Sequence, residues 1–140
     1  VDIRKDCNPD MILDLNKKLP FKRNSIMKVY AKMILEHLDN PNEFLKELIR
    51  VCENKAEIEI IVPHAFSYAS HTDFTHKSFY TENSFDMEIL RTIGISELKL
   101  VNQEFLYFNK WKRFIPFKNF FKIWFNGIYD DLYFKLEVVK

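Results

Sequence analysis

The run from residue 29 to residue 62 constrains the fold more than any other part of the chain. Its first segment, residues 29–34, is apolar and predicts a strand, and a helix follows almost at once. Asn40 can cap this helix, and Pro41 takes its first position, where no backbone donor is needed. Residues 57–62 predict a second strand, whose continuous apolar end is typical of parallel strands buried on both faces. The helix has one apolar face: Phe44, Leu45, Leu48, Ile49 and Cys52.

The rest of the chain extends this alternation of strands and helices. Residues 1–3 and 11–15 are short apolar runs that predict two more strands. Thr81 predicts the start of a second helix, and Gly94 predicts its end.

Two long strands are predicted near the C-terminus, over residues 97–108 and 132–139, and they can pair antiparallel at one edge. Strands that alternate with helices, followed by such a pair, predict an α/β fold with a doubly wound, Rossmann-like and mainly parallel sheet. The length of 140 residues suits a single domain over residues 1–140.

The composition is that of a globular domain with no bias toward polyanionic partners. Apolar residues make up 47% of the chain and the formal net charge is +1, so nucleic acid is not a favoured partner. No apolar run approaches the roughly 20 residues of a membrane-spanning helix. Cys7 and Cys52 lack C-x-x-C spacing, which favours a reducing, cytoplasmic location over a disulfide framework.

Polar side chains follow four of the predicted strands. Asp2, Asp14, the pair Glu36 and His37, and His64 each stand at a strand's end. In open α/β sheets ligands bind outside the carboxyl ends of the strands, so these residues are candidates for one site. The alternative is that short strands simply end in polar residues.

The sequence resembles the class I S-adenosylmethionine-dependent methyltransferases of the type 11-like group. Five segments carry the resemblance and occur in the family's order: VDI, LDLNKKLPF, MILEHLDNP, FLKELIRV and IIVPH. They cover about residues 1–94. The resemblance implies a doubly wound fold, S-adenosylmethionine as cofactor, and methyl transfer to an unknown small or lipid-like acceptor.

The resemblance also implies roles for single residues. Asp2 would bind both ribose hydroxyls of the cofactor, and Asp14 with Leu15 would hold its adenine. Ala31 and Lys32 would lie beside its methionine part.

A further group of residues would stand at the transfer site. The resemblance implies that Glu36 and His37 lie at its edge, and the loop over residues 64–76 adds further histidines. Methyl transfer needs a base only if the acceptor arrives protonated, and His37, or His76 oriented by Asp73, can serve. The alternative is that these histidines and Asp73 are ordinary polar loop residues above the strand ends, with no catalytic role. The loop lacks the tighter histidine pairs or cysteines of zinc sites, so no metal is predicted.

The family's glycine-rich cofactor loop has no counterpart in this sequence. It would precede Val1, and the only glycines are Gly94 and Gly127, both far downstream. The first strand–helix unit is therefore expected to be missing, which suggests an N-terminally incomplete chain that binds cofactor weakly or not at all. The resemblance favours an enzyme. The alternative is a degenerate, non-catalytic domain that acts as a binding or dimerisation module, for instance as a homodimer.

Residues 109–129 form a basic, aromatic insertion. Within it, residues 116–126 predict a helix, with aromatic residues such as Phe117 on one face and lysines on another. This segment can contact an anionic membrane surface through residues 110–125, lid an apolar substrate pocket, grip single-stranded nucleic acid, or pack in the core or in a dimer.

Overall fold

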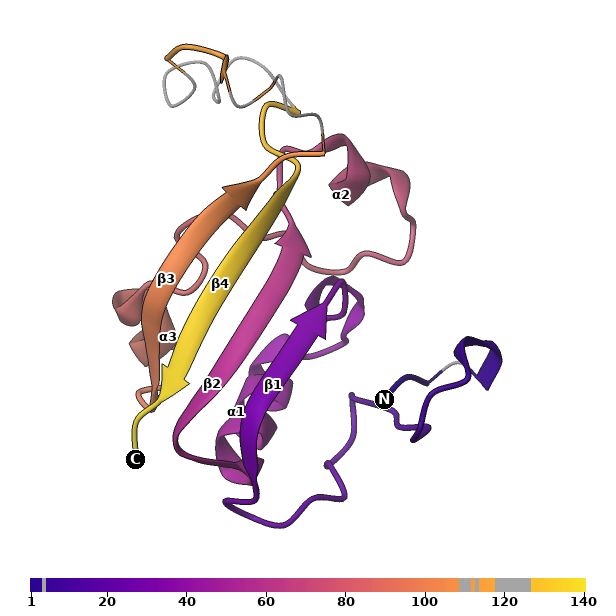
Figure 1. The fold of residues 1–140 in the computed structure, drawn as a ribbon, viewed down its shortest axis with the longest axis vertical. Helices are drawn as coiled ribbons and strands as arrows, with labels where there is room; N and C mark the ends of the chain where they lie inside the picture. Colours follow the sequence, from indigo (N-terminus) through magenta and orange to yellow (C-terminus); the bar gives the residue numbers. More distant parts are fainter. Residues whose placement is uncertain (4, 109–111, 113, 118–126) are drawn as a thin grey trace.

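A computed structural model describes residues 1–3, 5–108, 112, 114–117 and 127–140. Four strands form one sheet in the spatial order β1-β2-β4-β3 (Figure 1). Their bounds are β1 (Ile26–Lys32), β2 (Cys52–Pro63), β3 (Leu98–Leu106) and β4 (Asp131–Val138). β1 pairs with β2 in parallel, whereas β4 pairs antiparallel with both β2 and β3. The predicted α/β class and the late antiparallel pair are confirmed, in a mixed sheet.

Short helices connect and cover these strands. They are the 3-10 turns η1 (Lys5–Cys7) and η2 (Leu35–His37) and the helices α1 (Pro41–Val51), α2 (Tyr68–Thr72) and α3 (Met87–Thr92). α1 makes the crossover between β1 and β2, and it lies with α3 behind the sheet in the view of Figure 1.

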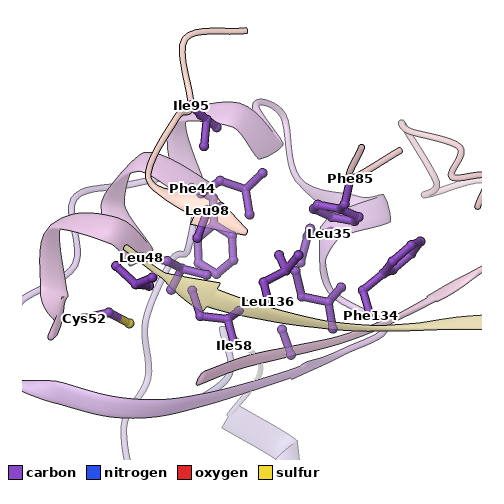
Figure 2. Close-up of a cluster of buried hydrophobic side chains, with 14 of the residues drawn as sticks. Leu35, Phe44, Leu48, Cys52, Ile58, Phe85, Ile95, Leu98, Phe134 and Leu136 are labelled. Atoms are coloured by element: carbon purple, nitrogen blue, oxygen red, sulfur yellow. The ribbon is translucent and has the colours of Figure 1, made fainter. Parts of the chain in front are cut away.

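The core lies between the sheet and these two helices. Phe44 and Leu48 of α1 meet Ile58 of β2 and Leu136 of β4 in this layer, as Figure 2 shows. Along β2 and β4 buried side chains alternate with half-exposed ones. The expectation that residues 57–62 are buried on both faces is therefore wrong for the described part of the chain.

The other face of the sheet carries paired charges. Lys28 Nζ lies 2.6 Å from Glu59 Oε1, and Lys135 Nζ lies 2.6 Å from Glu57 Oε1, both across neighbouring strands. Opposite charges on adjacent strands stabilise the pairing where one face meets water.

Several predicted element boundaries move. Residues 1–3 and 11–15 are not strands but meet in a single parallel bridge between Asp2 and Ile12. The helix predicted to start at Thr81 is α3, and it begins at Met87. The Thr81 N–H donates to the Ser84 hydroxyl at 2.8 Å, and this local bond makes a turn.

The aromatic insertion is described only in part. Residues 109–111, 113 and 118–126 lie outside the described residues, and with them most of the predicted helix over 116–126. Phe117 is 79% exposed and has a φ of +54°, so it is neither helical nor buried within the domain. None of the described helices is long and apolar enough to cross a membrane.

Two segments of the resemblance, LPF and RV, are joined by one polar cluster. Arg50 of α1 donates to the carbonyl oxygens of Phe21 at 3.1 Å and of Leu19 at 2.9 Å. Glu47 accepts the Leu19 N–H at 3.0 Å and pairs with Arg50 at 2.8 Å. These residues therefore tie the loop that enters β1 to the helix that leaves it, which is a structural role.

The start of α1 follows its sequence signals, and it can be tested. The Asn40 side chain accepts the Glu43 N–H at 3.3 Å. Asn40→Ala should lower the free energy of unfolding by about 1 kcal/mol, because the amide would lose its acceptor. Urea denaturation measures the change. Asn42→Ala, two residues further along, is the control and should not destabilise; an equal loss in both variants would contradict the capping role.

Candidate functional site

A pocket of about 550 Å³ lies at the carboxyl end of β1. Four segments line it: residues 1–3, 13–16, 33–38 and 73–75, with Val1, Asp2, Ile3, Leu13, Asp14, Leu15, Asn16, Met33, Ile34, His37, Leu38, Asp73 and Thr75. A volume in this range is typical of small-molecule sites. The lining combines apolar side chains with carboxylates.

Three of the predicted cofactor residues share this pocket. Asp2, Asp14 and Leu15 all line it, although the sequence separates Asp2 from the other two. The parallel bridge explains how they meet: the Asp2 N–H donates to Met11 O at 3.2 Å, and the Leu13 N–H donates to Asp2 O at 3.0 Å. These two bonds hold Asp2 beside residues 11–13, so that Asp14 and Leu15, which follow directly, lie close to Asp2.

The Asp14 carboxylate also takes part in a local turn. It accepts the Asn16 N–H at 3.1 Å and lies 3.3 Å from Lys17 Nζ. The Asn16 N–H, followed by Lys17, holds the pKa of Asp14 below its usual value, so this carboxylate is ionised at neutral pH.

The remaining predicted cofactor residues lie away from the pocket lining. Ala31 is 2% exposed and belongs to the core, and Lys32 is exposed at the end of β1. Glu36 is a fully buried residue of the η2 turn.

Sequence reasoning missed several residues that line the pocket, among them Met33, Ile34 and Thr75. Met33 and Ile34 show how this happened. The predicted strand ran through both, but β1 ends at Lys32 and Met33 has a φ of +52°. A positive φ is uncommon for a residue with a side chain and is often found at functional sites. The Met33 N–H still donates to Ile61 O at 2.9 Å, so the chain turns into the pocket directly from the sheet.

The three predicted catalytic residues, His37, Asp73 and His76, come together beside the pocket. The rings of His37 and His76 have centroids 4.8 Å apart. His37 Nδ1 lies 2.9 Å from the Thr75 hydroxyl, which donates to Asp73 Oδ1 at 2.6 Å. Asp73 therefore orients His37 through Thr75.

His76 has a different partner from the predicted one. Its Nδ1 lies 3.0 Å from the Ser70 carbonyl oxygen, whereas its Nε2 lies 3.9 Å from Asp73 Oδ2. The second distance is that of an ion pair and is too long for a hydrogen bond. The Ser70 carbonyl is thus the group that orients the His76 ring.

The other two histidines of the loop lie elsewhere. His64 is 2% exposed, among the rings of Phe66, Phe105 and Tyr129. His71 stacks on Phe79. The run of histidines in the sequence therefore does not form one cluster.

Two carboxylates are buried near this site. Glu36 and Asp131 are 0% and 3% exposed, and burial raises the pKa of both, that of Asp131 to about 6. The charge of Asp130 adds to the shift of Asp131, and Lys32 opposes it. Both Glu36 oxygens and Asp131 Oδ1 have no hydrogen-bond partner within the described part of the chain.

Comparison with known proteins gives the fold its family context. Residues 4–60 match the methyltransferase-domain family. Among solved structures, a chain from the complex between the Haloferax volcanii methyltransferase activator Trm112 and a methyltransferase is 12% identical, with a TM-score of 0.64 over 93% of this chain and 61% of that one. The S-adenosylmethionine-dependent methyltransferase from Aquifex aeolicus is 17% identical, with a TM-score of 0.55 over 92% of this chain and 54% of that one. This chain has the class I methyltransferase fold.

The methyltransferase fold alone does not decide the reaction. The [4+2]-cyclase SpnF is 8% identical, with a TM-score of 0.59 over 92% of this chain and 55% of SpnF. This methyltransferase-like chain spans 61% and 55% of the first two structures that it matches. No curated protein sequence matches it. Function must be argued from the site.

Asp131 makes the stability of this methyltransferase-like domain depend on pH. A carboxyl whose pKa rises from 3.8 to about 6 on folding stabilises the fold below about pH 4 and loses that contribution as pH rises through 6. At pH 7 the ionisation of buried Asp131 lowers the free energy of unfolding by up to about 3 kcal/mol.

Asp131→Asn should therefore raise the free energy of unfolding at neutral pH, because the amide cannot ionise. The gain over the unsubstituted protein should shrink as pH falls from about 6 to 4. Urea denaturation over this range measures it. Asp10→Asn, on the surface, is the control and should change little; a pH-independent difference for Asp131→Asn would contradict the assignment.

Proposed function

We propose that the pocket binds S-adenosylmethionine and that the domain transfers a methyl group to a small or lipid-like acceptor. The observation that carries the proposal is the meeting of Asp2 and Asp14 in one pocket at the carboxyl end of β1. This is where α/β sheets bind ligands, and the family match over residues 4–60 supports the same cofactor. When bound, the cofactor supplies an activated methyl group on a positively charged sulfur.

The residues that line the pocket suit this ligand. We infer that the Asp2 carboxylate accepts hydrogen bonds from the two ribose hydroxyls, and that Asp14 with Leu15 holds the adenine. Carboxylates at positions 2, 14 and 73 also favour a cationic ligand over an anionic one. Ala31 and Lys32 lie outside the lining, so we assign the floor beneath the methionine part to Met33 and Ile34 instead.

His37 is the candidate base of the proposed reaction. It lines the pocket, and Thr75 holds its Nδ1 at 2.9 Å, which leaves Nε2 to accept a proton from an acceptor hydroxyl or amine. His76, whose ring is oriented by the Ser70 carbonyl oxygen, is the alternative base. Methyl transfer depends mainly on positioning and on exclusion of water, so a base adds to the rate only for a protonated acceptor.

A second candidate function is a non-catalytic binding or dimerisation module. The outer side of β1 has no partner strand among the described residues, and Met27 and Tyr30 are 71% and 56% exposed there. A sheet edge of this kind can pair with another chain, for instance in a homodimer or with a protein partner. The complex of the Haloferax volcanii relative with its activator supports the same idea.

The remaining proposals concern location and the insertion. An exposed Cys7 and a buried Cys52, both free thiols, suit a reducing, cytoplasmic compartment. Phe114 and Phe117 of the insertion, and Phe108 just before it, are exposed, which suits contact with a lipid-like acceptor or a membrane surface.

Titration calorimetry with S-adenosylmethionine tests the cofactor proposal. We expect weak, saturable binding with one site per chain. Asp2→Ala should weaken it at least about tenfold, because hydrogen bonds to charged groups are worth roughly 1.5–3 kcal/mol each. Asp14→Ala should weaken it less, since the proposed Asp2 contact is a clamp on two ribose hydroxyls.

Asp10→Ala is the matched control, because Asp10 is exposed and does not line the pocket. It should bind the cofactor as the unsubstituted protein does. An unchanged affinity in Asp2→Ala, or no saturable heat at millimolar ligand, would count against the proposed site.

A further inference from the structure

Glu36, His37 and His76 bring three metal-binding side chains into one cluster. One ligand atom from each lies within 4.8 Å of the others. Glu36 and His37 belong to η2, and His76 lies in the loop after α2. The backbone holds the two segments together, because the Lys77 N–H donates to Glu36 O at 2.7 Å and the Ser78 N–H donates to the same oxygen at 3.3 Å.

The Glu36 carboxylate is the member of this cluster that most needs a ligand. It is 0% exposed, and neither of its oxygens has a hydrogen-bond partner in the described part of the chain. A buried carboxylate without donors is costly unless it is protonated, paired with a positive charge or coordinated to a metal. The two imidazoles are the nearby groups able to share a cation with it.

The hydrogen bonds of the two histidines define which ring nitrogens are available. Ser70 O is a carbonyl and can only accept, so His76 Nδ1 carries the hydrogen. The Thr75 hydroxyl donates to the ionised Asp73, so His37 Nδ1 must donate to Thr75. Neutral rings held in this way present the lone pair of Nε2.

This arrangement matches the outer shell of known metal sites. Metal-bound histidines nearly always donate their other ring N–H to a carboxylate, a backbone carbonyl or a water, and this fixes the ring. Ser70 O does this for His76, and Thr75 backed by Asp73 does it for His37. Two imidazoles and one carboxylate form a donor set used for zinc and related transition metals, and not the all-oxygen set of calcium or magnesium.

We propose that Glu36, His37 and His76 bind a divalent transition-metal ion, with Zn²⁺ as the best fit. Ligand atoms at about 2.0–2.2 Å from the ion would be roughly 3.3 Å apart. The three ligand atoms, now within 4.8 Å of one another, would therefore approach each other by up to about 1.5 Å when the ion binds. His37 also lines the pocket, so an open coordination position faces the proposed transfer site. Metal binding does not depend on the proposed function. With the ion bound, the Nε2 atoms of His37 and His76 are ligands and are no longer free to act as the base, so the ion would instead orient an acceptor oxygen, a role that does rest on the proposed function.

The proposal differs from the sequence-based expectation of no metal site, and the reason is geometric. That expectation considered the spacing of the histidines between residues 64 and 76. The cluster instead takes a single histidine from that loop and adds the adjacent pair Glu36 and His37 from the end of β1.

Zinc titration calorimetry on the tag-free, chelator-treated protein tests the site. All samples carry Cys7→Ser, because Cys7 is an exposed thiol that can bind zinc itself. We expect one Zn²⁺ per chain, with at least a tenfold loss of affinity in Glu36→Gln and in His76→Ala. Co²⁺ in place of Zn²⁺ should give a visible absorption band in the parent protein that both variants lose.

His71→Ala is the matched control, since His71 lies in α2, just before the loop of His76, and stacks on Phe79 outside the cluster. It should retain full affinity. Circular dichroism checks folding, and Glu36→Gln, which keeps the shape of the side chain, carries the test if His76→Ala unfolds. Zinc should also raise the melting temperature of the parent but not of Glu36→Gln.

Zinc affinity that is absent, or unchanged in Glu36→Gln, would overturn the proposal and would leave a protonated Glu36 as the explanation of its burial. An equal loss in His71→Ala would also overturn it. The titrations contain no S-adenosylmethionine, so failure here leaves the cofactor site untouched. Likewise, unchanged cofactor binding in Asp2→Ala leaves the zinc result standing.

Discussion

The parallel pairing of β1 with β2 is the interaction on which the rest of the structure depends. Residues 28 to 32 pair with residues 57 to 61, and α1 crosses between the strands to cover their inner face. Parallel strands end at the same edge of a sheet, so this pairing places η2 and the loop after β2 next to one another. That neighbourhood contains the pocket, the paired histidines and the buried Glu36.

The same pairing explains why polar groups are buried here. The chain leaves β1 through Met33 in a strained conformation and then packs Leu35 and Glu36 into the core. Backbone hydrogen bonds from Lys77 and Ser78 to Glu36 O hold the loop after α2 against this turn. Local strain and buried carboxylates lower stability, and their concentration at one edge is typical of functional sites.

Part of the site could be predicted because its residues follow apolar runs of the sequence, although the runs at Asp2 and Asp14 form a single bridge and not strands. Asp2, Asp14 and His37 were found in this way, and they share the pocket. Ala31 and Lys32 were assigned by resemblance, yet Ala31 faces the core, since side chains alternate along β1. Met33 and Ile34 were missed because an apolar run shows no sign of where a strand stops. The positive φ of Met33, at the point where the strand stops, also leaves no mark in the sequence pattern.

The sequence by itself determined the local elements: α1 begins at Pro41 after its cap Asn40, Gly94 follows α3, and β4 alternates between buried and half-exposed side chains. Capping, backbone freedom and side-chain period act over a few residues, so they can be read locally. Only the tertiary structure decided which of four histidines meet. Backbone bonds of Lys77 and Ser78 to Glu36 bring His37 and His76 together, whereas His64 packs on Tyr129 and His71 stacks on Phe79. Such contacts depend on the order of strands in the sheet, which no short stretch of sequence specifies.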